Sequence, residues 1–299
     1  MAKFSKKAKQ TARNQAKSIA IKLNKKLKSL GTNRNYQDKL KNVAEWIKEQ
    51  SIPVRHIHDL TPKQAIMYLE YRSQFVAQSS LDMERQSIQA MMIHVTGKLS
   101  EDNNLPRIKS ELSSAKKSRA YSSGQVKTIS SSQKERNSLA TKIAYSAGLR
   151  AHELLTLQKP TERKPNTRPA NKTKWHGRVG VIYTVQGKGG LIREVLLPEN
   201  LSIELEKLKL DTSLEVTDRG IKYNTSYNLA GGKSWSNSFS SASKRNFGWS
   251  RGAHGVRHSY AQERMSELRK LGHSRQLALE TVSQEMGHFR PEITEVYLR

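Results

Sequence analysis

The sequence predicts a mainly α-helical protein with a small antiparallel β-sheet, divided into a helical N-terminal domain and a mixed α+β C-terminal domain. Three observations predict this arrangement. Apolar residues recur at helical spacing through most of the chain, strand-like alternation is confined to residues 179–197, and a polar, broken stretch at 106–122 separates two ordered halves. A chain of 299 residues is long enough for two domains that each bury a core.

The first segment, residues 1–30, is predicted to be a basic N-terminal arm. Between Met1 and Gln37 the chain has eleven Lys or Arg residues and no acidic residue. Such a segment is either a solvated, partly disordered tail or an arm that binds phosphates, and both descriptions can hold at once. We expect the bases from Lys3 to Lys28 to contact phosphates rather than nucleotide bases.

Residues 31–105 are predicted to form the helical first domain. Its first helix is indicated by a one-sided apolar stripe of Tyr36, Leu40, Val43, Ala44 and Ile47. A second helix opens at Thr61-Pro62, where an N-cap, a first-turn proline and a capping-box Gln64 coincide, and runs to about Ala77. The third helix has a stripe with a methionine pair typical of core packing, made of Ile88, Met91, Met92, Val95 and Leu99.

A linker is predicted over residues 106–122, and the second domain over 123–299. A helical region is expected up to Gly148, after which the apolar period changes to two. Alternating residues from Val179 to Val185 and the run at 195–197 flank a glycine-rich turn, which indicates an antiparallel hairpin. Further helices are predicted at 201–210, 236–247, 253–271 and 274–286, with a short one opening at Pro291.

The charge of the chain predicts a polyanionic partner. Lys and Arg number 53 against 26 Asp and Glu, which leaves a net charge of +27, and nucleic acid is the first candidate. No apolar run has the length of a membrane-spanning helix, and the N-terminus lacks the apolar core of a signal peptide. We therefore expect a cytoplasmic protein associated with the nucleoid. The absence of cysteine excludes disulfides, thiolate zinc sites and cysteine nucleophiles.

Two pairs of residues in the second domain have side chains suited to phosphate binding. His254 and Arg257 are three apart on a predicted helix and share one face, although such a pair alone is usually a surface feature. Arg150 follows a helix stop and has Glu153 beside it. That carboxylate either orients the guanidinium for bidentate phosphate binding or forms only a structural ion pair.

Nucleotide and metal sites are not supported by the local patterns. Lys188 stands between glycines at the expected hairpin tip, but no Ser or Thr follows it, so the P-loop pattern fails. His258 forms a pair with His254 at a spacing of four residues. However, Gly255 stands where the zinc-protease motif requires glutamate.

Taken in order, six residues resemble the active-site pattern of the tyrosine recombinase, or phage integrase, family: Arg150, Lys188, His254, Arg257, His288 and Tyr297. The motifs are Ala-Gly-Leu-Arg-x-x-Glu-Leu, the hairpin lysine, His-x-x-Arg, and Gly-His with a tyrosine nine residues later. The resemblance spans residues 123–299 as a catalytic domain. Residues 31–105 resemble the family's DNA core-binding domain in size, helicity and charge.

The resemblance implies a site-specific DNA recombinase or integrase for a mobile element, working without metal, nucleotide or other cofactor. Tyr297 would attack the scissile phosphate to give a 3′-phosphotyrosine and a free 5′-hydroxyl, which conserves the bond for rejoining. Lys188 would protonate the leaving 5′-oxygen, and His254 would assist proton transfer at the tyrosine hydroxyl.

The same resemblance assigns the remaining residues to charge stabilisation. Arg150 and Arg257 would clamp the non-bridging oxygens of the phosphate, and His288 would add a donor. Glu153 would hold Arg150 in place. Two other functions stay open: a DNA-binding protein of the same fold without catalysis, and a DNA-relaxing enzyme like the type IB topoisomerases.

The expected partners are double-stranded DNA recombination sites, with self-assembly into a tetramer on DNA. Accessory DNA-bending proteins are further candidate partners, and no membrane contact is expected. Only Leu298 and Arg299 follow Tyr297 in this sequence, which leaves little chain to dock on a neighbour. Together with the repulsion between highly charged copies, this predicts a monomer in the absence of DNA.

Overall fold

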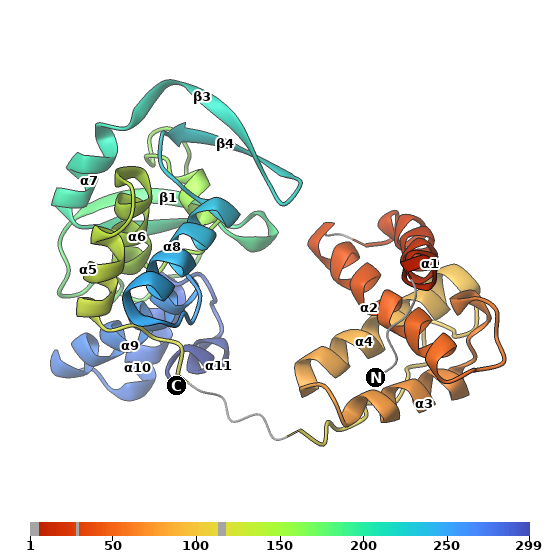
Figure 1. Ribbon diagram of the computed structural model, residues 1–299. Helices are drawn as coiled ribbons and strands as arrows, with labels where there is room; N and C mark the ends of the chain where they lie inside the picture. The colour runs from red at the N-terminus through yellow and green to blue at the C-terminus, as the bar shows by residue number, and fades with distance from the viewer. Residues whose placement is uncertain (1–5, 28–29, 113–117) are drawn as a thin grey trace. The chain divides into compact units, whose positions relative to one another are not determined.

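The computed structural model describes residues 6–27, 30–112 and 118–299. The chain divides into two compact units, Met1–Ala115 and Lys116–Arg299 (Figure 1). Each unit has its own apolar core. The described residues are mainly helical, with two small antiparallel hairpins, which confirms the expected fold class. Across these ranges, no helix combines the length and apolar character needed to cross a membrane.

Unit 1 is a helical bundle. Its elements are α1 (Lys6–Asn24), α2 (Leu30–Glu49), a 3-10 turn (Ile57–Asp59), α3 (Pro62–Ser73), α4 (Gln78–Met91) and a π-helical turn (Met92–Thr96). The capping box predicted at Thr61 is present, because its hydroxyl accepts from the backbone N–H of Gln64 and the Gln64 side chain accepts from the backbone N–H of Thr61. The expected apolar stripes form the core of this bundle.

The segment predicted to be a basic arm differs from that expectation. Within residues 1–30, helix α1 instead packs along α2, and four apolar side chains on one of its faces are fully buried: Ala12, Ala16, Ile19 and Leu23. Burial of this apolar face outweighs mutual repulsion among the bases of the helix, of which Arg13, Lys17 and Lys22 are exposed. Residues 1–5 and 28–29 lie outside the described residues.

Much of the predicted linker, 106–122, is packed against one unit or the other. Ile108 is partly buried against the core of unit 1, and the backbone N–H of Glu111 donates to the carbonyl of Ser73. Further on, Tyr121 is buried in the core of unit 2. The remaining part, residues 113–117, lies outside the described residues.

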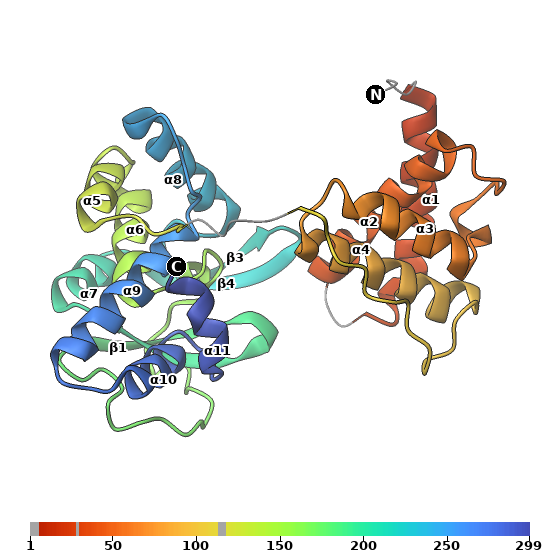
Figure 2. The same cartoon turned by 90° about the horizontal axis from the view of Figure 1, so that it is seen from below.

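Unit 2 carries the two hairpins and the remaining helices (Figure 2). Its elements are α5 (Ser123–Ser131), α6 (Glu135–Ala147), a 3-10 turn (Glu153–Thr156), β1 (Val181–Gln186), β2 (Ile192–Leu197), α7 (Glu199–Glu206), β3 (Lys209–Asp218), β4 (Ile221–Tyr227), α8 (Gly232–Phe247), α9 (Gly255–Lys270), α10 (Arg275–Glu285), α11 (Pro291–Thr294) and a final 3-10 turn (Glu295–Tyr297). The β1–β2 register pairs Val181 with Leu197 and Gln186 with Ile192.

The β3–β4 hairpin is the element that sequence reasoning missed. The helix predicted over 201–210 ends at Glu206, and β3 begins three residues later. Most of β3 is exposed, with Leu214 at 53% and Ile221 on its partner strand at 40%, so no buried face imposes a clear alternation on the sequence. This hairpin extends away from the helices of unit 2 (Figure 1).

Candidate active site

Arg150 is placed by a forced stop of helix α6. Gly148 ends the helix at φ +60°, and a side chain there would strike Tyr260, since a Cβ would lie 2.6 Å from its ring. The chain then turns so that Arg150 faces Glu153 on the following 3-10 turn. Arg150 Nη1 donates to Glu153 Oε1 at 2.7 Å, and the Arg150 backbone N–H donates to Oε2 at 2.8 Å.

Glu153 is the buried centre of an arginine cluster. Its side chain is fully buried, and its Oε2 lies 2.9 Å from Arg193 Nη2 and 3.9 Å from Arg257 Nη1. Burial by itself raises the pKa of this carboxyl, but Arg193, Arg257 and Arg150 outweigh burial and hold it well below its usual range. The carboxylate is therefore charged at neutral pH, and it balances only one of the three guanidinium charges.

Arg257 comes from the first turn of α9 and is fully buried. Its guanidinium donates to the carbonyl of Gly148, to the carbonyl of Met286 at 2.5 Å and to His288 Nε2 at 2.9 Å. Burial, together with the nearby charge of Arg150, lowers its pKa to about 10, which still leaves it protonated at neutral pH. The result is a fixed cation whose orientation is set by two backbone carbonyls.

His288 is held in one neutral form by its two neighbours. Because Arg257 can only donate, Nε2 of His288 accepts, and Nδ1 then donates to Thr294 Oγ1 at 2.9 Å. Burial and the charges of Arg257 and Arg150 lower the His288 pKa to about 3. The ring is thus a neutral imidazole fixed between α9 and α11.

Tyr297 lies against this cluster, half-buried, on the final 3-10 turn. Its ring centroid is 5.0 Å from His288, 5.6 Å from His254 and 4.7 Å from His258, and Arg257 Cζ lies 5.6 Å from it. The position is fixed from α9, because the Gln262 side chain donates to the Tyr297 carbonyl at 3.1 Å. A tyrosine, three histidines and a buried arginine therefore converge.

Lys188 stands at the tip of the β1–β2 hairpin, as predicted, and is exposed. It lines a cavity of about 470 Å³ whose wall also includes Arg150, Arg193 and His288. A second cavity of about 490 Å³ is lined by His254, His258 and Tyr297, among others, and Ile293 lines both. The lysine thus shares a cavity with the cluster, and its side chain makes no hydrogen bond or ion pair to another described residue.

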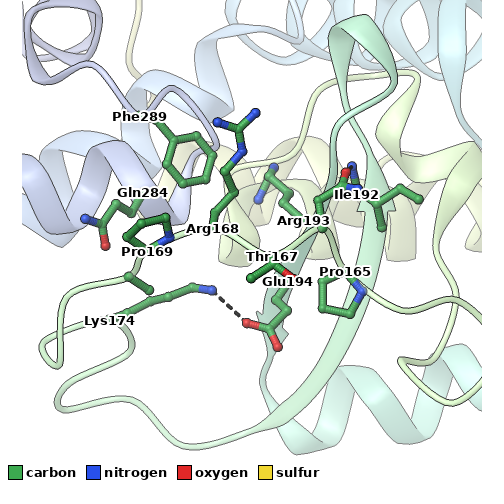
Figure 3. Close-up of a pocket in the computed structure, with 12 residues that line it drawn as sticks. Pro165, Thr167, Arg168, Pro169, Lys174, Ile192, Arg193, Glu194, Gln284 and Phe289 are labelled. Carbon is green, nitrogen blue, oxygen red and sulfur yellow. Dashed lines mark hydrogen bonds and ion pairs between the residues drawn. The ribbon is translucent and has the colours of Figure 1, made fainter.

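Sequence reasoning gave three residues no role in this site: Arg193, Thr294 and His258. The ring of His258 lies 4.7 Å from that of Tyr297. Arg193 had a detectable signal, since on β2 it shares a face with Val195 and Leu197, and a charge on the buried face of a strand is unusual. Arg193 also lines a neighbouring cavity of about 250 Å³, where Arg168 lies over the ring of Phe289 (Figure 3).

Among the described residues, no group of three or more His, Cys, Asp or Glu could hold a metal ion.

The histidines predict a loss of stability in mild acid. Burial, followed by nearby positive charges, lowers the pKa of His258 to about 4 and that of His288 to about 3, against 6.5 in the unfolded chain. The unfolded state therefore protonates first as pH falls, and stability drops below pH 6.5. We expect a loss of about 1 to 2 kcal/mol per pH unit between about pH 6.5 and 5. Urea denaturation at a series of pH values measures it, and a flat profile would contradict it.

Comparison with known proteins gives matches among solved structures, while no family model and no curated protein matches the sequence. The site-specific recombinase XerH bound to a palindromic difH substrate is similar over 91% of this chain and 77% of its own, with a TM-score of 0.57 and 17% identity. A lambda integrase dimer bound to a core site is similar over 96% of this chain and 94% of its own, with a TM-score of 0.61 and 16% identity. This chain has the fold of these recombinases and integrases.

A third structure extends the comparison to a transposon enzyme. The Tn1549 transposon integrase bound to transposon right-end DNA is similar over 95% of this chain and 94% of its own, with a TM-score of 0.56 and 11% identity. The fold implied by the active-site motifs is therefore confirmed. The recombinase–integrase fold covers both units, including the helical unit 1, for which the sequence offered only size, helicity and charge.

Proposed function

We propose that this protein is a site-specific DNA recombinase or integrase that cuts and rejoins DNA through a 3′-phosphotyrosine, serving a mobile element. The observation that carries the proposal is the convergence of Tyr297 with Arg257 and His288, in contact with the Arg150–Glu153 pair. The similar solved structures include recombinases and integrases on DNA, one of them from a transposon.

The arginine cluster suits a phosphodiester. Three guanidiniums around one buried carboxylate leave two unbalanced positive charges. A phosphodiester carries one negative charge, which rises toward two as the attacked phosphorus becomes five-coordinate. Arg150 and Arg257 then stabilise the transition state more than the ground state, which is the condition for catalysis.

Proton transfers complete the reaction. The Tyr297 oxygen forms a bond to phosphorus, the bond from phosphorus to the 5′-oxygen breaks, and the phenol loses its proton while the 5′-oxygen gains one. His254 is the acceptor: burial and the charge of Arg257 lower its pKa to about 4, so its imidazole is neutral, and a bound phosphate would raise that pKa. Lys188 donates to the 5′-oxygen.

Recovery of covalent protein–DNA adducts from cells tests the function. The proposal predicts adducts at one or a few sequences, and exchange between two such sequences when they are placed on one plasmid. A DNA-binding protein of this fold without catalysis gives no adduct. A relaxing enzyme gives adducts and removes supercoils without exchanging strands.

Assembly is part of the same proposal. A lambda integrase tetramer bound to a Holliday junction is among the similar structures. We propose that this protein is a monomer when free and forms a tetramer on paired sites, because DNA neutralises its charge of +27. Accessory DNA-bending proteins would assist by holding the sites together.

Lys188→Ala is expected to slow single-turnover cleavage by about 100-fold or more, because the leaving 5′-oxygen departs without a proton. A substrate with sulfur at the bridging 5′ position has a leaving group that scarcely needs protonation, so it should restore the rate. Arg150→Ala is the control, since loss of a clamp is not repaired by a better leaving group. Equal restoration of both variants, or of neither, would contradict the role of Lys188.

Helix α1 and the turn that follows it are expected to bind phosphates through their exposed bases. Deletion would remove part of the core, so the suitable variant changes four exposed bases to glutamine: Arg13, Lys17, Lys25 and Lys26. If each neutralises one phosphate, the slope of log affinity against log salt should fall by about 3 to 4. Filter binding over a salt series measures the slope, with sequence preference preserved. An unchanged slope would show that these bases face solvent in the complex.

A further inference from the structure

Arg193 connects two parts of the candidate site from inside the core. It lies on β2 with only 5% of its surface exposed. Its Nη2 binds Glu153 Oε2 at 2.9 Å, and its Nη1 donates to the carbonyl of Glu285 at 2.7 Å. One guanidinium thus bridges the turn that carries Arg150 and the end of helix α10, just before His288.

The Arg193 side chain also supports the turn that carries His288. Gly287 has φ +70°, and a Cβ built there would lie 2.4 Å from Arg193 Cδ. Glycine is therefore required for two reasons: the left-handed backbone and the arginine pressed against it. This contact places the Arg193 side chain directly against the turn that precedes His288.

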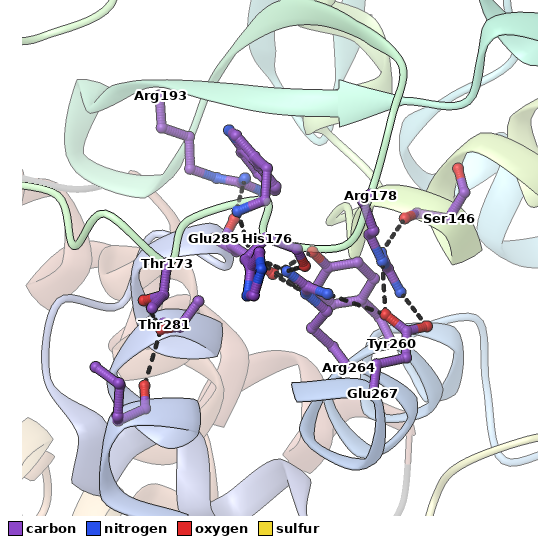
Figure 4. Close-up of polar contacts among 12 residues, drawn as sticks. Ser146, Thr173, His176, Arg178, Arg193, Tyr260, Arg264, Glu267, Thr281 and Glu285 are labelled. Atoms are coloured by element: carbon purple, nitrogen blue, oxygen red, sulfur yellow. Dashed lines mark hydrogen bonds and ion pairs between the residues drawn. The ribbon is translucent and has the colours of Figure 1, made fainter. Parts of the chain in front are cut away.

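The carbonyl that Arg193 binds belongs to a rigid element. The Glu285 carboxylate accepts from Arg264 at 3.0 Å, from the Tyr260 hydroxyl at 2.8 Å and from the Trp175 backbone N–H at 3.0 Å (Figure 4). Arg264 and Glu285 are both fully buried. Arg193 is therefore anchored to a backbone carbonyl whose position is fixed by these hydrogen bonds.

We propose that Arg193 is a positioning residue of the strand-transfer site, which sets the arginine clamp and the His288 turn relative to each other by binding Glu153 and the Glu285 backbone together. The proposal rests on the proposed function. In the structure, Glu153 Oε2 lies 2.9 Å from the Arg193 guanidinium and 3.9 Å from that of Arg257. Without Arg193, this carboxylate loses its nearer partner and attracts Arg257 toward itself. That shift takes Arg257 away from His288, and displacements of about 1 Å can reduce rates about 100-fold.

The test compares Arg193→Met and Arg193→Lys with a matched control. Arg163→Met is suitable, because Arg163 binds Thr184 on the same sheet and the Thr156 carbonyl but does not contact Glu153. Single-turnover covalent cleavage is measured on a phosphodiester and on a methylphosphonate, whose scissile group is uncharged. We expect Arg193→Met to lose about 100-fold on the phosphodiester and under about 10-fold on the methylphosphonate, with DNA affinity nearly unchanged. Arg193→Lys should be intermediate.

A second readout does not depend on catalysis. The His288 ring faces Arg257, Arg150 and Arg193, whose charges lower its pKa, and Glu153, which raises it. In Arg193→Met the His288 pKa should rise through loss of that charge alone, so the deciding variant in a histidine NMR titration of the DNA-free protein is Arg193→Lys, which keeps the charge but has a single ammonium in place of the two-ended guanidinium that binds Glu153 and the Glu285 carbonyl. We expect the His288 pKa to rise in Arg193→Lys, because Arg257 moves away from His288, and to stay unchanged in Arg163→Met. If the parent protein forms no adduct, the proposed function fails, and this titration still decides the role of Arg193.

Two results would overturn the proposal. The first is a parent-like cleavage rate in Arg193→Met, or an equal loss of rate on the phosphodiester and the methylphosphonate. An equal loss would indicate only that a smaller fraction of the variant is folded. The second is an unchanged His288 pKa in Arg193→Lys, the variant that keeps the charge. A selective loss on the phosphodiester together with a raised His288 pKa in Arg193→Lys supports the positioning role.

Discussion

Tyr297→Phe is expected to bind DNA as the parent does and to form no covalent complex. The change removes one oxygen, the proposed nucleophile, and leaves the ring that packs against His254, His258 and His288. The hydrogen bond from Gln262 to the Tyr297 backbone carbonyl is also preserved by the substitution. Denaturing gels with labelled DNA measure the adduct, and gel-shift titration measures the affinity.

Tyr223→Phe is the matched control, since Tyr223 lies on the β3–β4 hairpin outside the cluster. This variant should form adducts at the parent rate. An adduct that persists in Tyr297→Phe would assign the nucleophile to another residue.

Glu153→Ala is expected to have the largest effect on stability. It leaves Arg150, Arg193 and Arg257 facing one another without the buried carboxylate that they share. Removal of one partner of a buried ion pair costs about 3 to 5 kcal/mol, because the remaining charges stay buried and unpaired. Urea denaturation at pH 7 should show a loss of this size, and cleavage should be undetectable.

Acid should reduce the difference between Glu153→Ala and the parent. The pKa of Glu153 is lower in the folded state than the unfolded value of 4.5, so its stabilisation is present above about pH 4.5 and is lost as pH falls through the folded-state value. Glu206→Gln is a control with a carboxylate that binds Tyr183 and Lys159 nearer the surface, and it should lose much less. A similar loss in both variants would contradict the central role of Glu153.

Local signals in the sequence predicted much of the fold. The capping box at Thr61, the helix stop at Gly148 and the alternation in β1 act through neighbouring residues, so each is legible in a short stretch of sequence. The exposed β3–β4 hairpin has no buried face to impose a period and was missed. Helix α1 was not predicted, because the many Lys and Arg residues of this segment suggested an arm, although one apolar face of the helix packs in the core of unit 1.

The candidate site shows the same division. The motifs placed Arg150, Arg257 and His288 in one set, and the structure brings their side chains into one connected cluster. The bridge made by Arg193 and the hydrogen bond between Arg257 and His288 join residues 31 to 92 positions apart, so no short motif encodes them. The catalytic roles of these residues stay predictions until they are measured.

Mapping of the amino acid that carries DNA after cleavage tests the central claim most directly. The protein is incubated with a nicked substrate that releases a short 5′ fragment and so traps the covalent complex. Protease and nuclease digestion followed by mass spectrometry then locates the attached nucleotide. We predict a nucleotide joined through its 3′-phosphate to the Tyr297 oxygen, and an unmodified mass for every other tyrosine-containing peptide. A nucleotide on any other residue, or a cleaved substrate with no attached protein, would contradict the account.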